Sequence, residues 1–216
     1  MGRIEARKAM SGSEEPSAQP ARLGPVEDPT PEQAELLEAY RAFSDGEPFN
    51  IFRTLAHHPK LFKKSMVLAT ALLLKGNLPP RTREVVILRV AWRSGSVYEW
   101  GQHVRIGLDS GLTQEEIDAL ATEAAEAITD EGERLAVTVT DELMATVDLT
   151  DATWDAAVAQ WGEQDLMEMI FLAGNYRMLA GFLNSARVEL DEGLGGFPTE
   201  ACRTSLPWPT HRLGCW

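Results

Sequence analysis

Residues 81–117 carry the sequence RTREVVILRVAWRSGSVYEWGQHVRIGLDSGLTQEEI, which decides the fold. Its first part is apolar on a helical repeat, and a Ser-Gly pair then interrupts the pattern. A second helical run follows and stops at Gly111, after which a capping box opens another helix. The stretch therefore predicts two long helices, over about 81–93 and 96–110, and a third directly behind them.

Helical periodicity continues on both sides of this stretch. A capping hydroxyl and a proline at the first helical position open a helix behind Thr30, which should end near Phe43. Further helices are expected over residues 61–75, 130–146, 151–161 and 165–190, with Gly162 separating the last two. Only Leu135–Thr140 alternates as a strand would, and helix-forming residues continue it. The sequence therefore predicts an all-α fold.

The two ends of the chain differ from its centre in composition. Residues 1–29 are rich in Gly, Ser, Glu, Pro and Gln without apolar periodicity, which predicts a disordered segment. We expect one helical domain over residues 30–196 and an irregular tail over 197–216. The tail contains Cys202 and Cys215, which form neither a C-x-x-C pair nor a zinc-ligand spacing. Free thiols are the ordinary interpretation of such a pair in a reducing compartment.

Composition restricts the classes of function. With 216 residues, 44% of them hydrophobic, the chain can bury a sizeable core. The net charge of −13 argues against nucleic-acid binding, which usually needs clustered Lys and Arg. No stretch approaches the roughly 20 apolar residues of a membrane-spanning helix, and the beginning of the sequence lacks the apolar part of a secretory signal. We therefore expect a cytoplasmic protein with neither a nucleic-acid nor a membrane partner.

Glu84 occupies an unexpected position in the first of the two long helices. At 100° per residue it falls at the centre of the apolar arc made by Ile87, Leu88, Ala91 and Trp92. A buried carboxyl must be paired, hydrogen-bonded or protonated, and burial raises its pKa toward the range useful for proton transfer. Alternatively, Glu84 lies in the first helical turn because the helix dipole favours a negative charge there.

Ser96, Glu99 and His103 follow one face of the second long helix. Glu99 and His103 are four residues apart and can touch, and a carboxylate beside an imidazole suits acid–base catalysis. The structural alternative is a Ser96–Glu99 capping box and a core histidine bonded to a carbonyl. A metal site that adds His57 and His58 is conceivable, although nothing in the sequence fixes that arrangement.

Two aromatic neighbours also have both a functional and a structural interpretation. Trp100, like Trp92, could line a pocket or be an ordinary core residue. Tyr98 lies about 140° around the helix from His103, so an ideal helix directs it to another face.

The stretch 81–117 closely resembles the signature of the carboxymuconolactone decarboxylase and alkylhydroperoxidase D (AhpD)-like superfamily. The similarity is strongest over residues 49–120, and NYRMLAGFLN at 175–184 is similar to a second-half helix of the same superfamily. The resemblance implies an all-α, AhpD-like helical bundle. It also implies a homotrimer or homohexamer whose site lies in a cleft near subunit contacts.

The resemblance assigns the candidate residues one by one. In its peroxidase branch the superfamily has a C-x-x-C pair with a Glu before it and a His after it. Glu84 and His103 match these positions, whereas Ser96 and Glu99 occupy the cysteine positions and Tyr98 replaces an additional His. A hydroxyl and a carboxyl cannot run a disulfide cycle. The chain is therefore more similar to the decarboxylase side, whose members use neither a metal nor an organic cofactor.

Three functions remain open from the sequence. We favour a cofactor-independent, decarboxylase-like lyase for a small carboxylated lactone or related organic acid. In it His103 would transfer the proton, Glu99 would orient or charge it, and Glu84 would complete a relay. Ser96, Tyr98 and Trp100 are possible lining residues of this site. The alternatives are peroxidase or other oxidoreductase activity and a non-catalytic oligomer that binds a small molecule.

Overall fold

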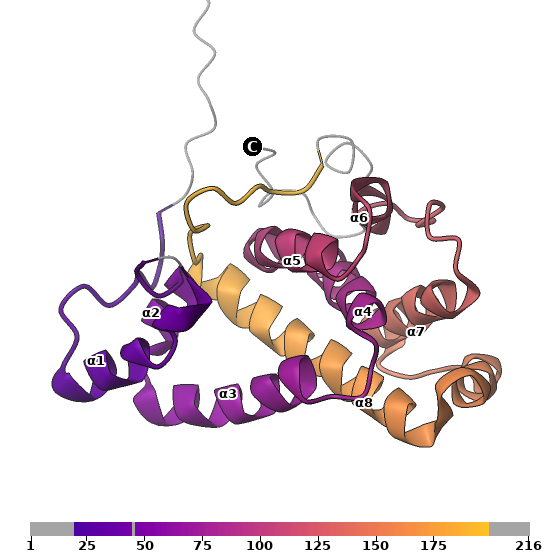
Figure 1. Cartoon of the computed structure of the whole chain (residues 1–216), viewed down its shortest axis with the longest axis horizontal. Helices are drawn as coiled ribbons and strands as arrows, with labels where there is room; N and C mark the ends of the chain where they lie inside the picture. The colour runs from indigo at the N-terminus through magenta and orange to yellow at the C-terminus, as the bar shows by residue number, and fades with distance from the viewer. Residues whose placement is uncertain (1–19, 45, 199–216) are drawn as a thin grey trace, which may run out of the picture.

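The computed structural model describes residues 20–44 and 46–198, and all regular elements in these ranges are helices (Figure 1). This confirms the predicted all-α class. The elements are α1 (Pro31–Glu38), the 3₁₀ helix η1 (Arg41–Phe43), α2 (Asn50–Leu55), α3 (Pro59–Leu74), α4 (Pro80–Arg93), α5 (Val97–Asp109), α6 (Gln114–Leu120), α7 (Glu131–Thr146) and α8 (Asp151–Ala186). Within the described ranges, no helix combines the length and apolar character that crossing a membrane requires.

Helix α4 is the centre of the fold. It packs against α5, α6, α7 and α8, and every residue from Glu84 to Trp92 is buried. Proline begins the helix at Pro80, where a missing backbone N–H costs nothing, and Ser94 closes it by bonding to Val90 O. A helix buried on all sides has no solvent for its polar side chains, so each of them needs a partner within the protein.

Arg89 meets that requirement through α7. Its side chain is fully buried and donates to both oxygens of Asp141, at 2.7 and 2.6 Å. Further donors reach carbonyls at the end of α6 and in the α6–α7 loop. Arg93 binds the same carboxylate, and both guanidinium groups lie over the ring of Trp92, at 4.5 and 4.6 Å from its centroid. These contacts hold α4 against α7 on the side away from α5.

The N-terminal helices form a second, smaller core. Leu36, Leu55 and Phe62 are buried together, and the rings of Tyr40 and Phe52 pack against Phe62. Figure 1 shows α3 running along the underside of the molecule, with α1 and α2 at one end. The short helix α2 was not predicted, because its six residues lie in a stretch that Gly46 and Pro48 mark as loop.

Residues 20–29 fall inside the segment predicted to be disordered, yet they pack on the domain. Arg22 N and Leu23 N both donate to Ala186 O at the end of α8, and Val26 N donates to Arg53 O. Val26 is buried in the second core. These backbone bonds satisfy groups that would otherwise be unpaired at helix ends, a type of contact that leaves no apolar period in the sequence. The remaining residues of the segment, 1–19, lie outside the described ranges.

Helix α8 joins the two helices expected over 151–161 and 165–190. Gly162 has φ 82° and ψ 166°, which breaks the helical geometry at the predicted stop and bends the element there. The helix ends at Ala186, and Arg187 adopts a left-handed conformation as its cap. The chain then continues as an irregular segment, residues 188–198, which we name the C-terminal strap.

The C-terminal strap lies against α5 and is held by one carboxylate. Asp191 Oδ1 accepts from Asn50 N of α2 at 2.8 Å, while Oδ2 accepts from Gln102 at 2.7 Å and from the Tyr98 hydroxyl of α5. A Cβ atom on Gly101 would lie 2.8 Å from Gly195 O, so only glycine permits this approach. The strap therefore joins α2 and α5 after the last helix has ended.

Candidate active site

A buried carboxylate–imidazole pair joins α4 to α5. Glu84 is 0% exposed, and its Oε2 lies 2.7 Å from Nδ1 of His103. An ionised carboxylate can only accept a hydrogen bond, so in this pair Nδ1 carries the proton and Nε2 is left for another partner. The second oxygen of Glu84 accepts from Arg83 Nε at 3.1 Å. Glu84 therefore fixes both the orientation and the tautomer of His103.

Glu99 lies on the same stripe of α5 as His103 but does not bind it. The prediction that Glu99 orients His103 is therefore corrected: the partner is Glu84, because the packing of α4 on α5 brings its carboxylate to the imidazole. Glu99 is 3% exposed, and neither of its oxygens has a hydrogen-bond partner among the described residues. Burial raises the pKa of Glu99 well above its ordinary value, and the nearby Ser96 hydroxyl opposes this only in part. Burial therefore favours the protonated, neutral form of Glu99.

Ser96 has the position of a helix cap without performing that role. It is the N-cap residue of α5, but its side chain makes no capping hydrogen bond, so the capping-box alternative does not apply. Its Oγ is fully buried and without a hydrogen-bond partner in the described part of the chain. Ser96 and Glu99 therefore place a hydroxyl and a carboxyl close together on one helical face, with no hydrogen bond to any other described residue. Buried polar groups of this kind call for an explanation, and a catalytic role is one.

Tyr176 of α8 completes the group, and the sequence did not single it out. Its ring meets the His103 ring edge-on, with centroids 5.0 Å apart and an interplanar angle of 86°. Burial raises the pKa of Tyr176, the charge of Glu84 adds to this rise, and Arg83 opposes it. The NYRMLAGFLN segment contains Tyr176, but helical periodicity assigns an aromatic there to the core.

Tyr98 and Trp100, the other two possible lining residues, belong to different contacts. Besides its bond to Asp191, the Tyr98 hydroxyl accepts from Ile51 N at 3.1 Å, and Tyr98 is buried under the strap. Trp100 packs in the main core, with its ring 5.2 Å from that of Phe197. Both side chains position α5, and neither makes a described hydrogen bond to Glu84, Glu99 or His103.

The remaining candidate ligands lie elsewhere. His57 Nε2 lies 3.0 Å from Gly24 O, and the side chain of His58 caps α3 by accepting from Leu61 N. Within the described ranges, no group of three or more His, Cys, Asp or Glu residues is placed to hold a metal ion. Cys202 and Cys215 lie outside the described residues.

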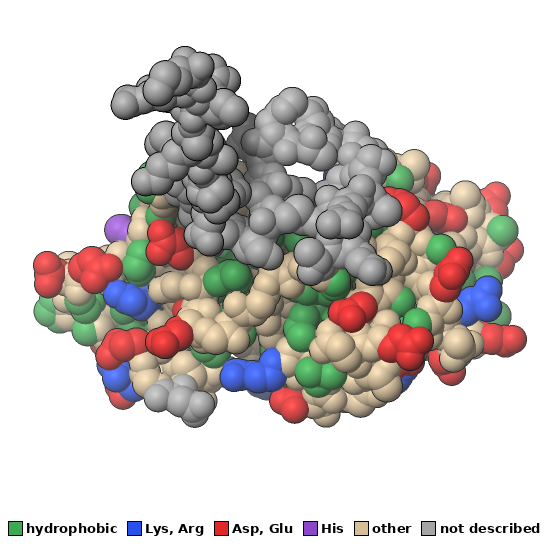
Figure 2. Space-filling model, turned by 90° about the horizontal axis from the view of Figure 1, so that it is seen from above, with side chains coloured by type: hydrophobic (Ala, Val, Ile, Leu, Met, Phe, Trp, Pro, Cys, Tyr) green, Lys and Arg blue, Asp and Glu red, His purple; other side chains and the backbone are tan. Residues whose placement is uncertain are grey.

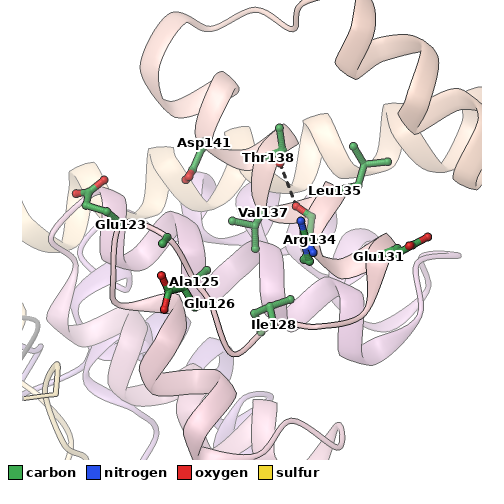
Figure 3. A pocket seen from close by; sticks show the side chains of 11 residues that line it. Glu123, Ala125, Glu126, Ile128, Glu131, Arg134, Leu135, Val137, Thr138 and Asp141 are labelled. Carbon is green, nitrogen blue, oxygen red and sulfur yellow. Dashed lines mark hydrogen bonds between the residues drawn. The ribbon is translucent and has the colours of Figure 1, made fainter.

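An open depression beside α7 is separate from this group. It has a volume of about 760 Å³ and lies between the α6–α7 loop and α7 (Figure 3). Its lining mixes apolar and acidic side chains and comprises Glu123, Ala124, Ala125, Glu126, Ile128, Glu131, Arg134, Leu135, Val137, Thr138 and Asp141. It shares no residue with the Glu84–His103 pair, so we take the buried group as the candidate active site.

A family model matches the part of the chain that contains the candidate site. Residues 59–142 match the model of the carboxymuconolactone decarboxylase family, and this range includes Glu84, Ser96, Glu99 and His103. The predicted resemblance to the carboxymuconolactone decarboxylase and AhpD-like superfamily is thereby confirmed. None of the curated proteins matches the chain.

Solved structures share the fold at low sequence identity. An uncharacterised peroxidase-related protein with an AhpD core from Ralstonia eutropha JMP134 is 18% identical, with a TM-score of 0.71 over 81% of this chain and 95% of that one. A peroxidase-related protein from Silicibacter sp. TM1040 is 14% identical, with a TM-score of 0.73 over 84% and 98%. A variant of the debrominase Bmp8 in complex with 2,3,4-tribromopyrrole is 14% identical, with a TM-score of 0.66 over 81% and 94%. The fold is therefore AhpD-like.

Proposed function

We propose that the protein is a cofactor-independent lyase that decarboxylates a small carboxylated lactone or a related organic acid. One observation carries the proposal: Glu99, whose neutral form is favoured by burial, lies on the same helical face as His103, whose imidazole is oriented by the buried Glu84. Such a site contains both a proton donor and an oriented imidazole in a largely water-free interior. These groups suit proton transfer near neutral pH.

The proposed roles follow from the hydrogen bonds. Glu84 holds Nδ1 of His103, which leaves Nε2 to exchange a proton with the substrate. Neutral Glu99 donates a hydrogen bond to the oxygen on which negative charge develops. Ser96 offers a second donor beside it, and the edge of Tyr176 limits the movement of the imidazole.

The proposed reaction needs no redox partner. The electron pair of the breaking C–C bond moves from the carboxylate into a conjugated carbonyl, and carbon dioxide leaves. Glu99 stabilises the resulting enolate oxygen, and protonated His103 delivers a proton to carbon. The proton lost by His103 is recovered from solvent, so charge and atoms balance over one turnover.

The residues at the cysteine positions disfavour peroxide reduction at this site. Ser96 and Glu99 offer no thiol to attack a peroxide or to form a disulfide. The Bmp8 debrominase neighbour was solved with a brominated pyrrole, which supports a small cyclic compound as the ligand of this fold. We infer a compact ring substrate from this likeness.

We also propose that the protein forms a homotrimer or homohexamer. Large apolar side chains lie exposed on α3 and α8, namely Leu61, Val67, Leu74, Met167, Phe171 and Met178. Monomeric proteins rarely expose such sets together on neighbouring elements. Analytical ultracentrifugation checks the proposal, and a monomer at micromolar concentration would contradict it.

One experiment tests the activity and separates the alternatives. The purified protein is incubated with carboxylated lactones, β-keto acids and organic hydroperoxides, and the products are identified by mass spectrometry. We expect loss of carbon dioxide from one acid in the wild type and at least a ~100-fold lower rate in His103→Asn. His57→Asn, which changes an exposed histidine remote from α5, is the matched control and should retain full activity. Hydroperoxide reduction would favour an oxidoreductase, and a ligand recovered unchanged would favour a binding protein.

A further inference from the structure

Arg83 differs from the other arginines of α4 in what it binds. Arg81 pairs with Glu116 and Glu133, while Arg89 and Arg93 pair with Asp141. Each of these three guanidinium groups therefore reaches a carboxylate on another element through its terminal nitrogens. Arg83 binds only its chain neighbour Glu84, through Nε. Within the described residues, neither of its Nη nitrogens has a hydrogen-bond partner.

The position of Arg83 places these nitrogens beside the candidate active site. One oxygen of Glu84 accepts from Arg83 and the other from His103, so the guanidinium and the imidazole are held by the same carboxylate. The Arg83 side chain is 16% exposed, which gives its outer edge access to solvent while Glu84 remains fully buried. The guanidinium thus lies at the boundary between the buried pair and the surface.

The charges around this position favour an anion. Arg83 is a permanent cation, Glu84 is shared between it and His103, and burial favours the neutral form of Glu99. A second carboxylate entering here therefore meets an available cation.

We propose that Arg83 is the binding residue for a substrate carboxylate, which its two Nη groups hold in a bidentate pair. This inference rests on the proposed function and names a residue that binds its substrate. An ion pair on the reacting carboxylate would stabilise the ground state more than the transition state, because that charge leaves with carbon dioxide. Arg83 therefore holds a carboxylate that remains on the product.

Equilibrium binding tests the inference without requiring turnover. The probes are γ-butyrolactone-γ-carboxylate, a saturated lactone without the conjugated carbonyl that decarboxylation needs, and its primary amide. Isothermal titration calorimetry should show that wild-type protein prefers the carboxylate. Arg83→Gln should weaken carboxylate binding by about tenfold or more while leaving amide binding within about twofold. Arg83→Lys, which keeps the charge without the planar fork, should give an intermediate affinity.

A matched control removes one positive charge elsewhere. Arg105 is exposed on the same helix as His103, and Arg105→Gln should change neither affinity by more than about twofold. Wild-type protein that binds the carboxylate no better than the amide would overturn the proposal. So would an Arg83→Gln variant that loses both probes equally, because Arg83 would then serve only to position Glu84. Thermal unfolding of each variant verifies that it is folded.

Failure of this inference and failure of the proposed function give different results. An Arg83-dependent preference for the carboxylate, without turnover of any acid, supports the anion site and contradicts the lyase. Turnover that Arg83→Gln leaves unchanged supports the lyase and contradicts the anion site. When both hold, the variant should raise KM far more than it lowers kcat, since the retained carboxylate is bound equally in the ground and transition states.

Discussion

Glu84 binds His103 across the α4–α5 interface, whereas Glu99, one turn before His103 on the same helix, makes no hydrogen bond to it. The two glutamates therefore have different environments: one is paired with an imidazole, and burial favours the neutral form of the other. Proton-transfer enzymes commonly rely on environments that separate the behaviour of similar groups in this way.

Glu84→Gln should test whether activity depends on the orientation and tautomer of His103, because the imidazole itself remains in place. The amide can donate to Nδ1 and so favours the tautomer with the proton on Nε2, which we expect to lower kcat by about 100-fold. Nitrogen-15 NMR of histidine-labelled protein measures the tautomer directly. Glu115→Gln, at an exposed position on α6, is the control and should match the wild type in both measurements. An unchanged tautomer together with unchanged kcat would remove Glu84 from the mechanism.

Glu99→Gln should stabilise the protein increasingly as pH rises. Burial raises the pKa of Glu99 in the folded state above the ordinary 4.5, so between these values the folded protein binds a proton that the unfolded chain has lost. The wild-type free energy of unfolding should therefore fall, relative to the variant, by about 1.4 kcal/mol per pH unit above pH 4.5 until the folded carboxyl ionises. Urea unfolding at a series of pH values measures this difference. A difference independent of pH would show that Glu99 is ionised when folded.

Asp141→Asn should destabilise the fold without involving the candidate site. The change leaves Arg89 fully buried with one carboxylate fewer, and we expect the free energy of unfolding to fall by about 3 kcal/mol. Burial alone would raise the pKa of Asp141, but hydrogen bonds from Arg93 and Arg89 outweigh it, so the pKa is lowered. The stability that the Asp141 carboxylate contributes is therefore present above pH 3.8 and is lost as pH falls through the pKa of the folded state.

The control for Asp141→Asn is a substitution of Glu123, another carboxylate that binds Arg93. Glu123→Gln removes a carboxylate that is 58% exposed, and should cost less than about 1 kcal/mol. Equal losses in the two variants would mean that burial of Arg89 does not depend on Asp141. Chemical denaturation at neutral pH and at pH 4 compares both variants with the wild type.

Gly101→Ala should displace the C-terminal strap from α5. The added methyl would lie 2.8 Å from Gly195 O, a backbone atom that cannot rotate away, so we expect a loss of about 1–3 kcal/mol and faster hydrogen exchange over residues 188–198. Gly181→Ala is the matched control in α8, where nothing lies within 4 Å of the new methyl, and should stabilise by about 0.5–1 kcal/mol. Unchanged exchange in Gly101→Ala would contradict the close contact.

The sequence was a better guide to which polar residues of α4 and α5 are buried than to which of them bind one another. Glu84 stood out because a carboxylate occupied the centre of an apolar arc, and the structure confirms that it is buried. The partner of His103 was misassigned because spacing within a helix reveals neighbours on that helix alone. Which residue of α4 meets His103 depends on how two helices cross, and a single sequence does not encode that crossing in any local pattern.

The fold shows the same division between local and long-range information. The capping boxes at Thr30 and Thr113 and the stop at Gly162 were predicted from local chemistry and are present. Helix α2 and the packing of residues 20–29 were not predicted, because contacts with distant elements stabilise them. Tyr176 was also not predicted as a site residue, because only the packing of α8 brings its ring to His103.

The complete burial of α4 also has a consequence for biosynthesis. The ribosome releases α4 before α7 and α8, the helices that cover two of its sides, so its apolar surface emerges without a binding partner on the growing chain. Arg89 likewise lacks its partner carboxylate until Asp141 is synthesised, 52 residues later. The packing around α4 is therefore complete only after α8 has left the ribosome.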